Sequence, residues 1–265
     1  MHLFFDTINL MYRSISADQY RKHLGFPPNY KVEAMLCYGT LYEEKVLHQL
    51  RKALQDLGIK AEINEMPDEF LRFAKELKVG DKNIWFAIGY GGAWLSEYLH
   101  WACLFGSKKN LLLGSCGGLK PGIKQGDFII PEYSYSEESS AKIYNRESNL
   151  HFSDKNLSEK ISKALEIDNT KVWRGPIITC QAMIGETLED VVSWSKNGYY
   201  GVEMEASTVF AVSKHFGVPV AASLYVGDNL IEEHHSLSEE YVAEADTRKQ
   251  NQAKQIKMAL SELLS

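Results

Sequence analysis

Apolar and polar positions along the chain follow two different periods. Short continuous apolar runs, typical of strands buried on both faces, occur at residues 34–38, 84–88, 110–113, 127–131, 173–178 and 218–226. Between them, apolar positions recur with the helical period at residues 42–57, 68–77, 93–105, 157–165, 188–196 and 207–216. A last helix is predicted from residue 238 to about residue 264.

This alternation of buried strands and amphipathic helices predicts an α/β fold. We expect one three-layer domain over residues 1–265, with a mixed, largely parallel central sheet flanked by helices. No internal linker interrupts the pattern, and residues 1–30 are expected to form an irregular leader. Pro67 stands where a first helical residue is favoured, which supports a helix over 68–77.

Charge and cysteine content narrow the class of protein. A formal net charge of -6 argues against nucleic acid or an anionic membrane as partner. The four cysteines are widely separated and form no CxxC pair, as expected of reduced thiols in a cytosolic protein. No basic start leads into a long apolar core, and no apolar run is long enough to span a bilayer. We therefore expect a cytoplasmic protein.

Two glycine clusters follow predicted strands. One runs from Gly89 to Gly92 and includes Gly91; the other, at residues 114–118, contains Ser115. Such turns let the backbone approach a ligand and expose N–H groups to an anion or a polar edge. The alternative is that both are tight turns required only for packing. Neither cluster reads as a dinucleotide-binding fingerprint.

An acidic cluster lies directly before the apolar helix predicted at 207–216. In GVEMEAS, residues 201–207, Glu203 and Glu205 flank Met204. If a strand ends just before them, they occupy a usual place for a ligand site in an open α/β sheet. The alternative is that both glutamates are N-terminal charges favoured by the helix dipole.

Taken in order, these segments resemble the nucleoside phosphorylase and nucleosidase superfamily. The resemblance is carried by GYGG, LLLGSCGGLKPGIKQGDFIIP, GVEMEAS and VAASLYVGDNL, and it extends from about His23 to Asp228. It implies that Glu205 holds the ribose 2′- and 3′-hydroxyls, with Met204 against the sugar and Glu203 beside them. It also implies that Asp228 is the general acid that protonates a departing purine, although Gly227 stands where the purine enzymes place a serine.

The resemblance also locates the base and the neighbouring subunit. The base is expected near TCQAMI, residues 179–184, with Met183 in the place of the family's stacking aromatic and Ile184 beside it. The glutamine and arginine that read uracil are not visible, which favours a purine-like base. His23 resembles a histidine of the family that contributes to the site of the neighbouring subunit, so a homodimer or hexamer is expected. The alternative for His23 is a surface residue of the leader.

Two phosphate-binding arginines of the family are missing. Glu43 stands in the place of one, and Leu112 in the place of the other. Because this change removes a bidentate anion clamp, we expect hydrolysis. Glu44, or Glu43 beside it, lies where the nucleosidases place their water-activating glutamate; alternatively, both begin a solvated helix. Ser115 keeps a hydroxyl that suits either phosphate or water.

The sequence thus predicts cleavage of the N-glycosidic bond of a purine-type nucleoside, with release of the free base. Two alternatives stay open. One is phosphorolysis, with phosphate as co-substrate at an altered site that includes Arg174, Lys120 or Lys124; the other is a non-catalytic nucleoside sensor. The partner is a small-molecule nucleoside, and we expect no metal or organic cofactor. His234 and His235 are interpreted as loop residues.

Overall fold

The computed structural model describes residues 11–166, 170–232 and 245–265. Its sheet is built from strands of mixed direction, in the order β10-β6-β8-β9-β5-β1-β4-β3-β2. The strands are β1 (Ala34–Gly39), β2 (Glu62–Glu65), β3 (Ala74–Val79), β4 (Lys82–Gly89), β5 (Asn110–Gly118), β6 (Phe128–Tyr135), β7 (Leu150–Phe152), β8 (Val172–Thr179), β9 (Gly201–Glu203) and β10 (Val220–Asn229). This confirms the α/β prediction, with a central sheet flanked by helices.

The interior of the sheet is parallel, and one part of it closes into a ring. Strand β1 pairs in parallel with β4 and β5, and β5 pairs in parallel with β10. Antiparallel pairs join β2, β3 and β4 at one edge. Because β10 also pairs with β6, and the path β6-β8-β9 returns to β5, these five strands form a closed circuit.

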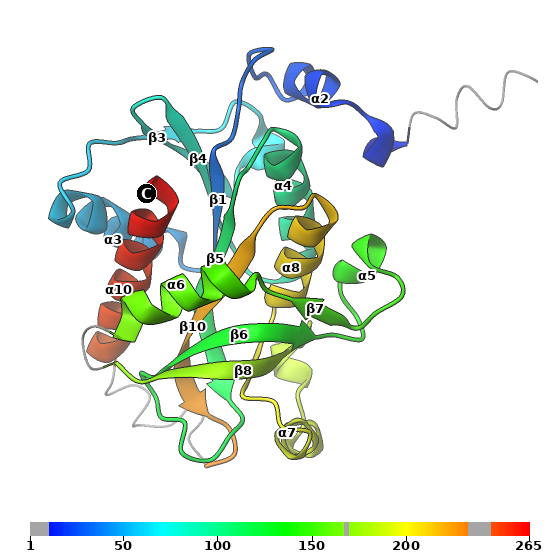
Figure 1. Ribbon diagram of the computed structural model, residues 1–265, viewed down its shortest axis with the longest axis vertical. Helices are drawn as coiled ribbons and strands as arrows, with labels where there is room; N and C mark the ends of the chain where they lie inside the picture. Colours follow the sequence, from blue (N-terminus) through cyan, green and yellow to red (C-terminus); the bar gives the residue numbers. More distant parts are fainter. Residues whose placement is uncertain (1–10, 167–169, 233–244) are drawn as a thin grey trace, which may run out of the picture.

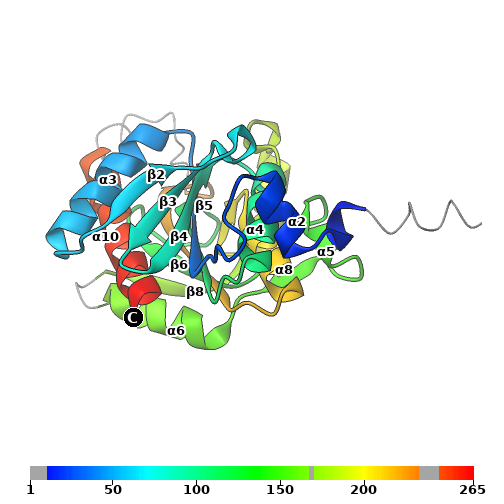
Figure 2. The same ribbon diagram turned by 90° about the horizontal axis from the view of Figure 1, so that it is seen from above.

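Helices cover both faces of the sheet, as Figures 1 and 2 show. One face is packed by α3, α6 and α10, and the other by α4, α5 and α8. The helices are α2 (Ala17–His23), α3 (Glu43–Asp56), α4 (Gly92–Leu104), α5 (Ala141–Tyr144), α6 (Lys155–Glu166), α7 (Leu188–Lys196), α8 (Ala206–His215) and α10 (Ala245–Leu264). Short 3-10 turns occupy Tyr12–Ser14 (η1), Glu69–Leu71 (η2) and Met183–Gly185 (η3).

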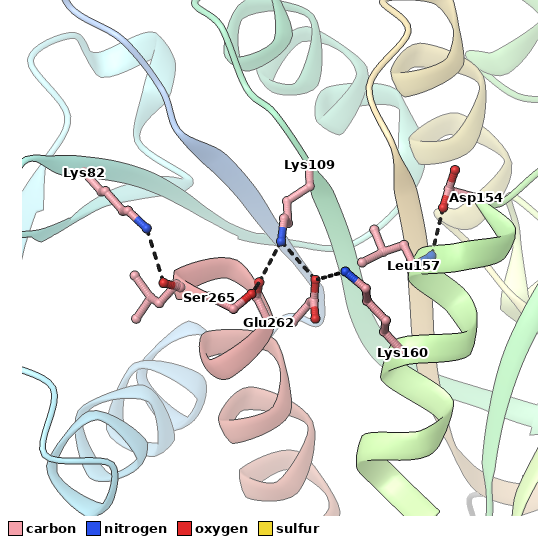
Figure 3. Close-up of polar contacts among 8 residues, drawn as sticks. Lys82, Lys109, Asp154, Leu157, Lys160, Glu262 and Ser265 are labelled. Carbon is pink, nitrogen blue, oxygen red and sulfur yellow. Dashed lines mark hydrogen bonds and ion pairs between the residues drawn. The ribbon is translucent and has the colours of Figure 1, made fainter.

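Lysine side chains hold the C-terminal end of α10 against the sheet and α6 (Figure 3). Lys109 Nζ donates to the Glu262 carbonyl at 2.8 Å and to its carboxylate at 2.9 Å. Lys82 Nζ donates to the Leu264 carbonyl at 3.2 Å. These cations satisfy carbonyls that a helix end leaves unpaired and complement its negative dipole end. The part of the last helix predicted for residues 238–244 lies outside the described residues.

The predicted helix over 68–77 is wrong. After η2, residues 74–79 form β3, which pairs antiparallel with β4 through Val79 and Lys82. Gly80, at φ +61°, and Asp81 form the two-residue connection, a Gly-Asp signal typical of hairpins. Pro67 does not begin a helix here; the Asp68 side chain accepts from Phe70 N and caps the 3-10 turn instead.

Two further expectations need correction. The leader is not irregular throughout, because Ala17–His23 is helical and begins with a capping box between Ser16 and Gln19. The second glycine cluster is not a loop, because β5 continues through it to Gly118 and pairs there with β10 and β9. Gly117 leaves room for the Leu230 side chain, which a Cβ would meet at 2.7 Å.

Candidate active site

A cavity of about 540 Å³ opens where several strands of the ring end. It is lined by residues from the first glycine cluster, the end of β5, η3 and the start of α7, the β9–α8 junction and the end of β10. Seven residues singled out from the sequence meet there: Ser115, Met183, Ile184, Glu203, Met204, Glu205 and Asp228. Segments far apart in the chain therefore converge on one site.

Glu203 is a buried carboxylate that caps the start of α8. Its Oε2 accepts the backbone N–H groups of Glu205 at 2.8 Å and Ala206 at 2.7 Å. Its Oε1 accepts the Thr179 hydroxyl at 2.5 Å. Burial raises the pKa of Glu203, while these hydrogen bonds to the charged form oppose the rise. With three donors directed at it, Glu203 is the member of the acidic pair whose charged form receives more hydrogen bonds.

Glu205 has a different environment, although it is also buried. Its Oε1 accepts one backbone hydrogen bond, from Gly91 N at 2.6 Å. Burial, together with the negative charge of Glu203, raises the pKa of Glu205 above its usual range. This carboxyl therefore gains most from a ligand that donates hydrogen bonds or develops positive charge beside it.

The glycines of the first cluster support Glu205 and α4 and are not among the residues that line the cavity. Gly91 has φ +87° and directs its N–H at the Glu205 carboxylate. Gly92 lies against α8, where a Cβ would meet Thr208 Oγ1 at 2.5 Å. Gly39, at the end of β1, does line the cavity; a Cβ there would meet Glu205 Oε2 at 2.7 Å. The first cluster thus acts through neighbouring side chains.

Asp228 lies near the end of β10, at an irregularity of the strand. The register between β10 and β5 shifts between Val226 and Asp228, so Gly227 occupies a bulge. Bulges re-aim the side chains next to them and occur frequently beside active sites. Asp228 is partly buried and lines the same cavity as Glu205.

Apolar side chains form the rim of the cavity. Met183 is 50% exposed and Ile184 is 91% exposed, and both belong to η3. The hydroxyl of Tyr90 donates to Met183 Sδ at 3.6 Å, which places an aromatic ring beside the methionine. Sequence reasoning had considered Tyr90 only as part of a glycine turn. Its position between two glycines after an apolar strand was the available signal.

Glu186 was also missed by sequence reasoning. It follows η3, is partly buried and lines the cavity that contains Asp228. Burial, with a smaller contribution from the charge of Asp228, raises the pKa of Glu186 to about 7. The Cys180 thiol donates to its carboxyl and opposes that rise. No periodicity marks a single glutamate at the end of a 3-10 turn, so the sequence held no clear signal for it.

Glu43 and Glu44 do not line the main cavity. Glu43 lines a smaller cavity of about 220 Å³, which shares Tyr90 with the main one. It pairs with Lys75 at 3.0 Å, which also pairs with Glu65 at 2.8 Å. Glu44 is exposed and lines neither cavity. The structure therefore separates the two candidates that the sequence left together.

His23 and the cations considered for phosphate also lie away from the cavity. His23 is exposed in the last turn of α2. Arg174 pairs with Glu132 and Glu159, each at 3.9 Å. Lys120 donates to the Tyr200 hydroxyl at 2.7 Å, and Lys124 is exposed. None of these four residues lines the main cavity.

Within residues 11–166, 170–232 and 245–265, no group of three or more His, Cys, Asp or Glu side chains has an arrangement that could hold a metal ion. Over the same ranges, no helix is both long and apolar enough to cross a membrane. His234 and His235 lie outside the described residues.

Comparison with known proteins gives consistent matches. The model of the "Phosphorylase superfamily" matches residues 88–265. Guanosine phosphorylase of Halorubrum lacusprofundi is 29% identical over 121 residues, 46% of this chain and 50% of that protein. A DeoD-type purine nucleoside phosphorylase of Clostridium beijerinckii is 31% identical over 130 residues, 48% of this chain and 54% of that protein. The chain thus spans about half the length of these curated relatives.

A solved structure shares the fold over most of the chain. The 5′-methylthioadenosine/S-adenosylhomocysteine nucleosidase of Neisseria meningitidis, in complex with methylthio-immucillin-A, superposes with a TM-score of 0.66. The match covers 87% of this chain and 100% of that chain at 19% identity. At this identity the likeness concerns the fold alone.

Proposed function

Since this chain belongs to the phosphorylase superfamily, we propose that it hydrolyses the N-glycosidic bond of a purine-type nucleoside. The relatives named above as guanosine phosphorylase and purine nucleoside phosphorylase support a purine base and cleavage at this bond. Water as the acceptor is supported by the side chains that line the cavity. Among the residues that the structure describes, the lining contains the carboxyl groups of Glu186, Glu203, Glu205 and Asp228, and no lysine or arginine.

The absence of a cation from the described lining carries the proposal. A phosphate dianion in this cavity finds no guanidinium or ammonium group among the described side chains to pair with, and every ionised carboxylate of the lining repels it. A neutral water molecule has no such penalty. A carboxylate such as Glu205 beside the sugar favours the positive charge that the sugar develops as its bond to the base lengthens. The cavity is thus better suited to hydrolysis than to phosphorolysis.

We assign a side chain to each step of the reaction. Glu205 accepts hydrogen bonds from the ribose hydroxyls, and Met204 packs against the sugar. As the bond between C1′ and the base nitrogen breaks, its electron pair passes to the base, and Asp228 donates a proton to a ring nitrogen. A water oxygen then bonds to C1′ and gives up its proton. The products are the free base and the sugar with a hydroxyl at C1′.

Glu43 is the side chain we propose for accepting the proton from water. It faces the smaller cavity beside Tyr90, on the side of the first glycine cluster, and it is only partly buried. Its pairing with Lys75 at 3.0 Å holds the carboxylate in place. Glu44, exposed and outside both cavities, is not assigned this role.

We also propose that the working unit is a homodimer or a hexamer. Ile184 and Leu188 are 91% and 76% exposed and line the cavity with half-exposed Met183, and a group of neighbouring exposed apolar side chains is typical of contact surfaces. His23 would then reach a neighbouring subunit. Light scattering on the purified protein checks this, and a monomer at micromolar concentration would exclude it.

The deciding assay follows base release by chromatography from a panel of purine and pyrimidine nucleosides. The panel includes a 5′-methylthio derivative, and each reaction is run without phosphate and with added phosphate. The proposal expects release of purine bases at the same rate under both conditions. Release only with phosphate means phosphorolysis at a site not formed by the cavity side chains. Binding without release from any nucleoside means a sensor.

A further inference from the structure

The start of α8 is not capped by its own N-cap side chain. Glu205 stands at the N-cap position, where a side chain usually accepts an N–H group of the first helical turn. Its carboxylate makes no such bond, and Oε1 accepts instead from Gly91 N, at 2.6 Å. Water has little access to the first turn, because Ala206, Ser207 and Thr208 are all buried. The N–H groups of this turn therefore require acceptors from other side chains.

Glu203 and Thr179 supply these acceptors. Glu203 Oε2 accepts the N–H of Ala206 at 2.7 Å. Thr179, the last residue of β8, accepts the N–H of Ser207 at 3.0 Å through Oγ1. The Thr179 hydroxyl also donates to Glu203 Oε1 at 2.5 Å, which joins the two side chains into one unit. Because the helix is capped in this way, the carboxylate of Glu205 is available to the cavity that it lines.

A chain of buried hydroxyl groups orients Thr179. A hydroxyl has one proton, and that of Thr179 goes to Glu203, so the bond of 2.7 Å between Ser134 Oγ and Thr179 Oγ1 is donated by Ser134. Ser134 accepts in turn from Ser207 Oγ at 2.9 Å. All three hydroxyls thus donate in one direction, toward Glu203, and bonds in such a chain strengthen one another. None of the three residues lines the main cavity, so their effect on a ligand passes through the acidic pair.

We propose that Thr179 and Ser134 are positioning residues, which cap α8 together with Glu203 and thereby leave Glu205 free to bind the ribose hydroxyls. This inference rests on the proposed nucleoside-cleaving function. Without the Thr179 hydroxyl, the N–H of Ser207 and Oε1 of Glu203 lose a partner in buried surroundings. The side chain whose position suits that N–H is Glu205, at the N-cap of the same helix. Its rotation toward the helix would withdraw it from the sugar.

A role in stability alone predicts a different outcome. The same hydroxyls join β6, β8 and α8, so removing one of them also lowers the free energy of unfolding. A loss of that kind alters the cleavage of all nucleosides by the same factor, because it changes only the amount of folded protein. Displacement of Glu205 instead penalises the substrate that has more hydroxyl groups to bind. The readout is therefore a ratio between two substrates.

The test compares kcat/KM for guanosine and for 2′-deoxyguanosine, which lacks one of the two hydroxyls assigned to Glu205. A hydrogen bond to a charged group contributes enough free energy to change a rate roughly tenfold or more. In Thr179→Val, which has nearly the same shape without the hydroxyl, we expect the guanosine-to-2′-deoxyguanosine ratio to fall about tenfold. Thr179→Ser keeps the hydroxyl and should retain a ratio within about twofold of wild type. Ser134→Ala should lower the ratio in the same direction, and it decides if Thr179→Val does not fold.

Thr208→Val is the matched control. Thr208 follows Ser207 in the first turn of α8 and is equally buried, and among the described residues its hydroxyl has no hydrogen-bond partner. The substitution therefore removes a buried hydroxyl from the same turn but none from the chain. Its substrate ratio should equal that of wild type, and its urea midpoint should be unchanged or higher. A fall of the ratio as large as in Thr179→Val would overturn the inference.

Calorimetric binding of the two nucleosides separates this inference from the proposed function. Base release with a ratio unchanged in Thr179→Val and Ser134→Ala overturns the inference and leaves the function standing. A binding preference for guanosine that both variants lose and Thr179→Ser keeps, without base release, supports the inference while the function fails. Failure of wild-type protein to bind or cleave any purine nucleoside of the panel overturns both.

Discussion

Replacing Glu203 by alanine tests whether this carboxylate is a structural cap. In the native protein, its Oε2 accepts two backbone N–H groups at the start of α8, from Glu205 and Ala206. Its Oε1 accepts the Thr179 hydroxyl. Glu203, Glu205 and Ala206 are all buried, so bulk water has little access to replace the lost acceptor. Glu203→Ala therefore leaves two buried amide donors unpaired.

The expected loss of stability follows from these contacts. Each buried donor left without an acceptor costs about 1–3 kcal/mol. Against this, removing a buried charge recovers part of its desolvation and relieves its repulsion of Glu205. We expect Glu203→Ala to lower the free energy of unfolding at pH 7 by about 2–4 kcal/mol. Glu203→Gln keeps an oxygen for the two amides and should lose about 1 kcal/mol.

Urea unfolding at several pH values provides the assay and a second readout. Burial raises the pKa values of Glu203 and Glu205 in the folded protein, while in the unfolded chain both titrate near about 4.3. Above that pH the folded state binds more protons, so the free energy of unfolding falls as pH rises from about 5 to 8, by at most about 1.4 kcal/mol per pH unit for each group. Glu203→Gln removes the charge that raises the pKa of Glu205 and should flatten this slope.

Two results would refute this reasoning. One is a Glu203→Ala protein as stable as wild type at pH 7, which would mean that the two amides find other acceptors. The other is a slope between pH 5 and 8 that is unchanged in Glu203→Gln, which would mean that Glu203 neither takes up a proton in this range nor acts on Glu205. Glu189→Ala, at an exposed position of α7, serves as the control and should stay within about 0.5 kcal/mol of wild type.

Three further substitutions test the proposed reaction. Asp228→Asn should lower kcat by about 10²–10⁴-fold, the usual contribution of a general acid, while calorimetry finds nucleoside affinity within a few-fold of wild type; unchanged turnover would remove Asp228 from the chemistry. In Gly39→Ala, the added Cβ would lie 2.7 Å from Glu205 Oε2, so the Glu205 side chain should be displaced. We expect kcat/KM to fall about 10- to 100-fold while the urea midpoint stays nearly unchanged. Full activity would show that the Glu205 position is not critical. Glu43→Gln should slow base release more than tenfold, whereas Glu44→Gln should change it less than about twofold; the reverse order would return the role to Glu44.

Sequence reasoning located the parts of the site that depend on strand ends. Glu205 and Asp228 follow strongly apolar segments, and the carboxyl ends of strands in an α/β sheet meet at a common ligand site. The structure places both side chains in one cavity with Met183. The buried strands β1, β4, β5 and β10 were recognised because each contains a short apolar run bounded by polar residues, which is typical of a strand buried on both faces.

The failures have specific physical causes. The apolar positions of residues 68–77 fit both the helical and the strand period. The Gly80-Asp81 turn favours a hairpin and was overlooked in the prediction of a helix. Glu186 faces the cavity because a 3-10 turn directs it there, and no sequence period describes such a turn. Glu43 and Glu44 are neighbours in the chain, so only the orientation of α3 distinguishes a partly buried carboxylate from an exposed one.

The closed circuit of strands has a consequence for self-association. Strands β5, β9, β8, β6 and β10 pair around a ring, so their backbone groups offer little template to a foreign strand. Among the described strands, β2 and β7 remain at the margins of the sheet. Strand β2 is short and carries a glutamate at each end, whose charges repel a second copy, and β7 has three residues. Aggregation through edge pairing would therefore require the ring to open first. We expect variants of lower global stability to aggregate more readily for this reason.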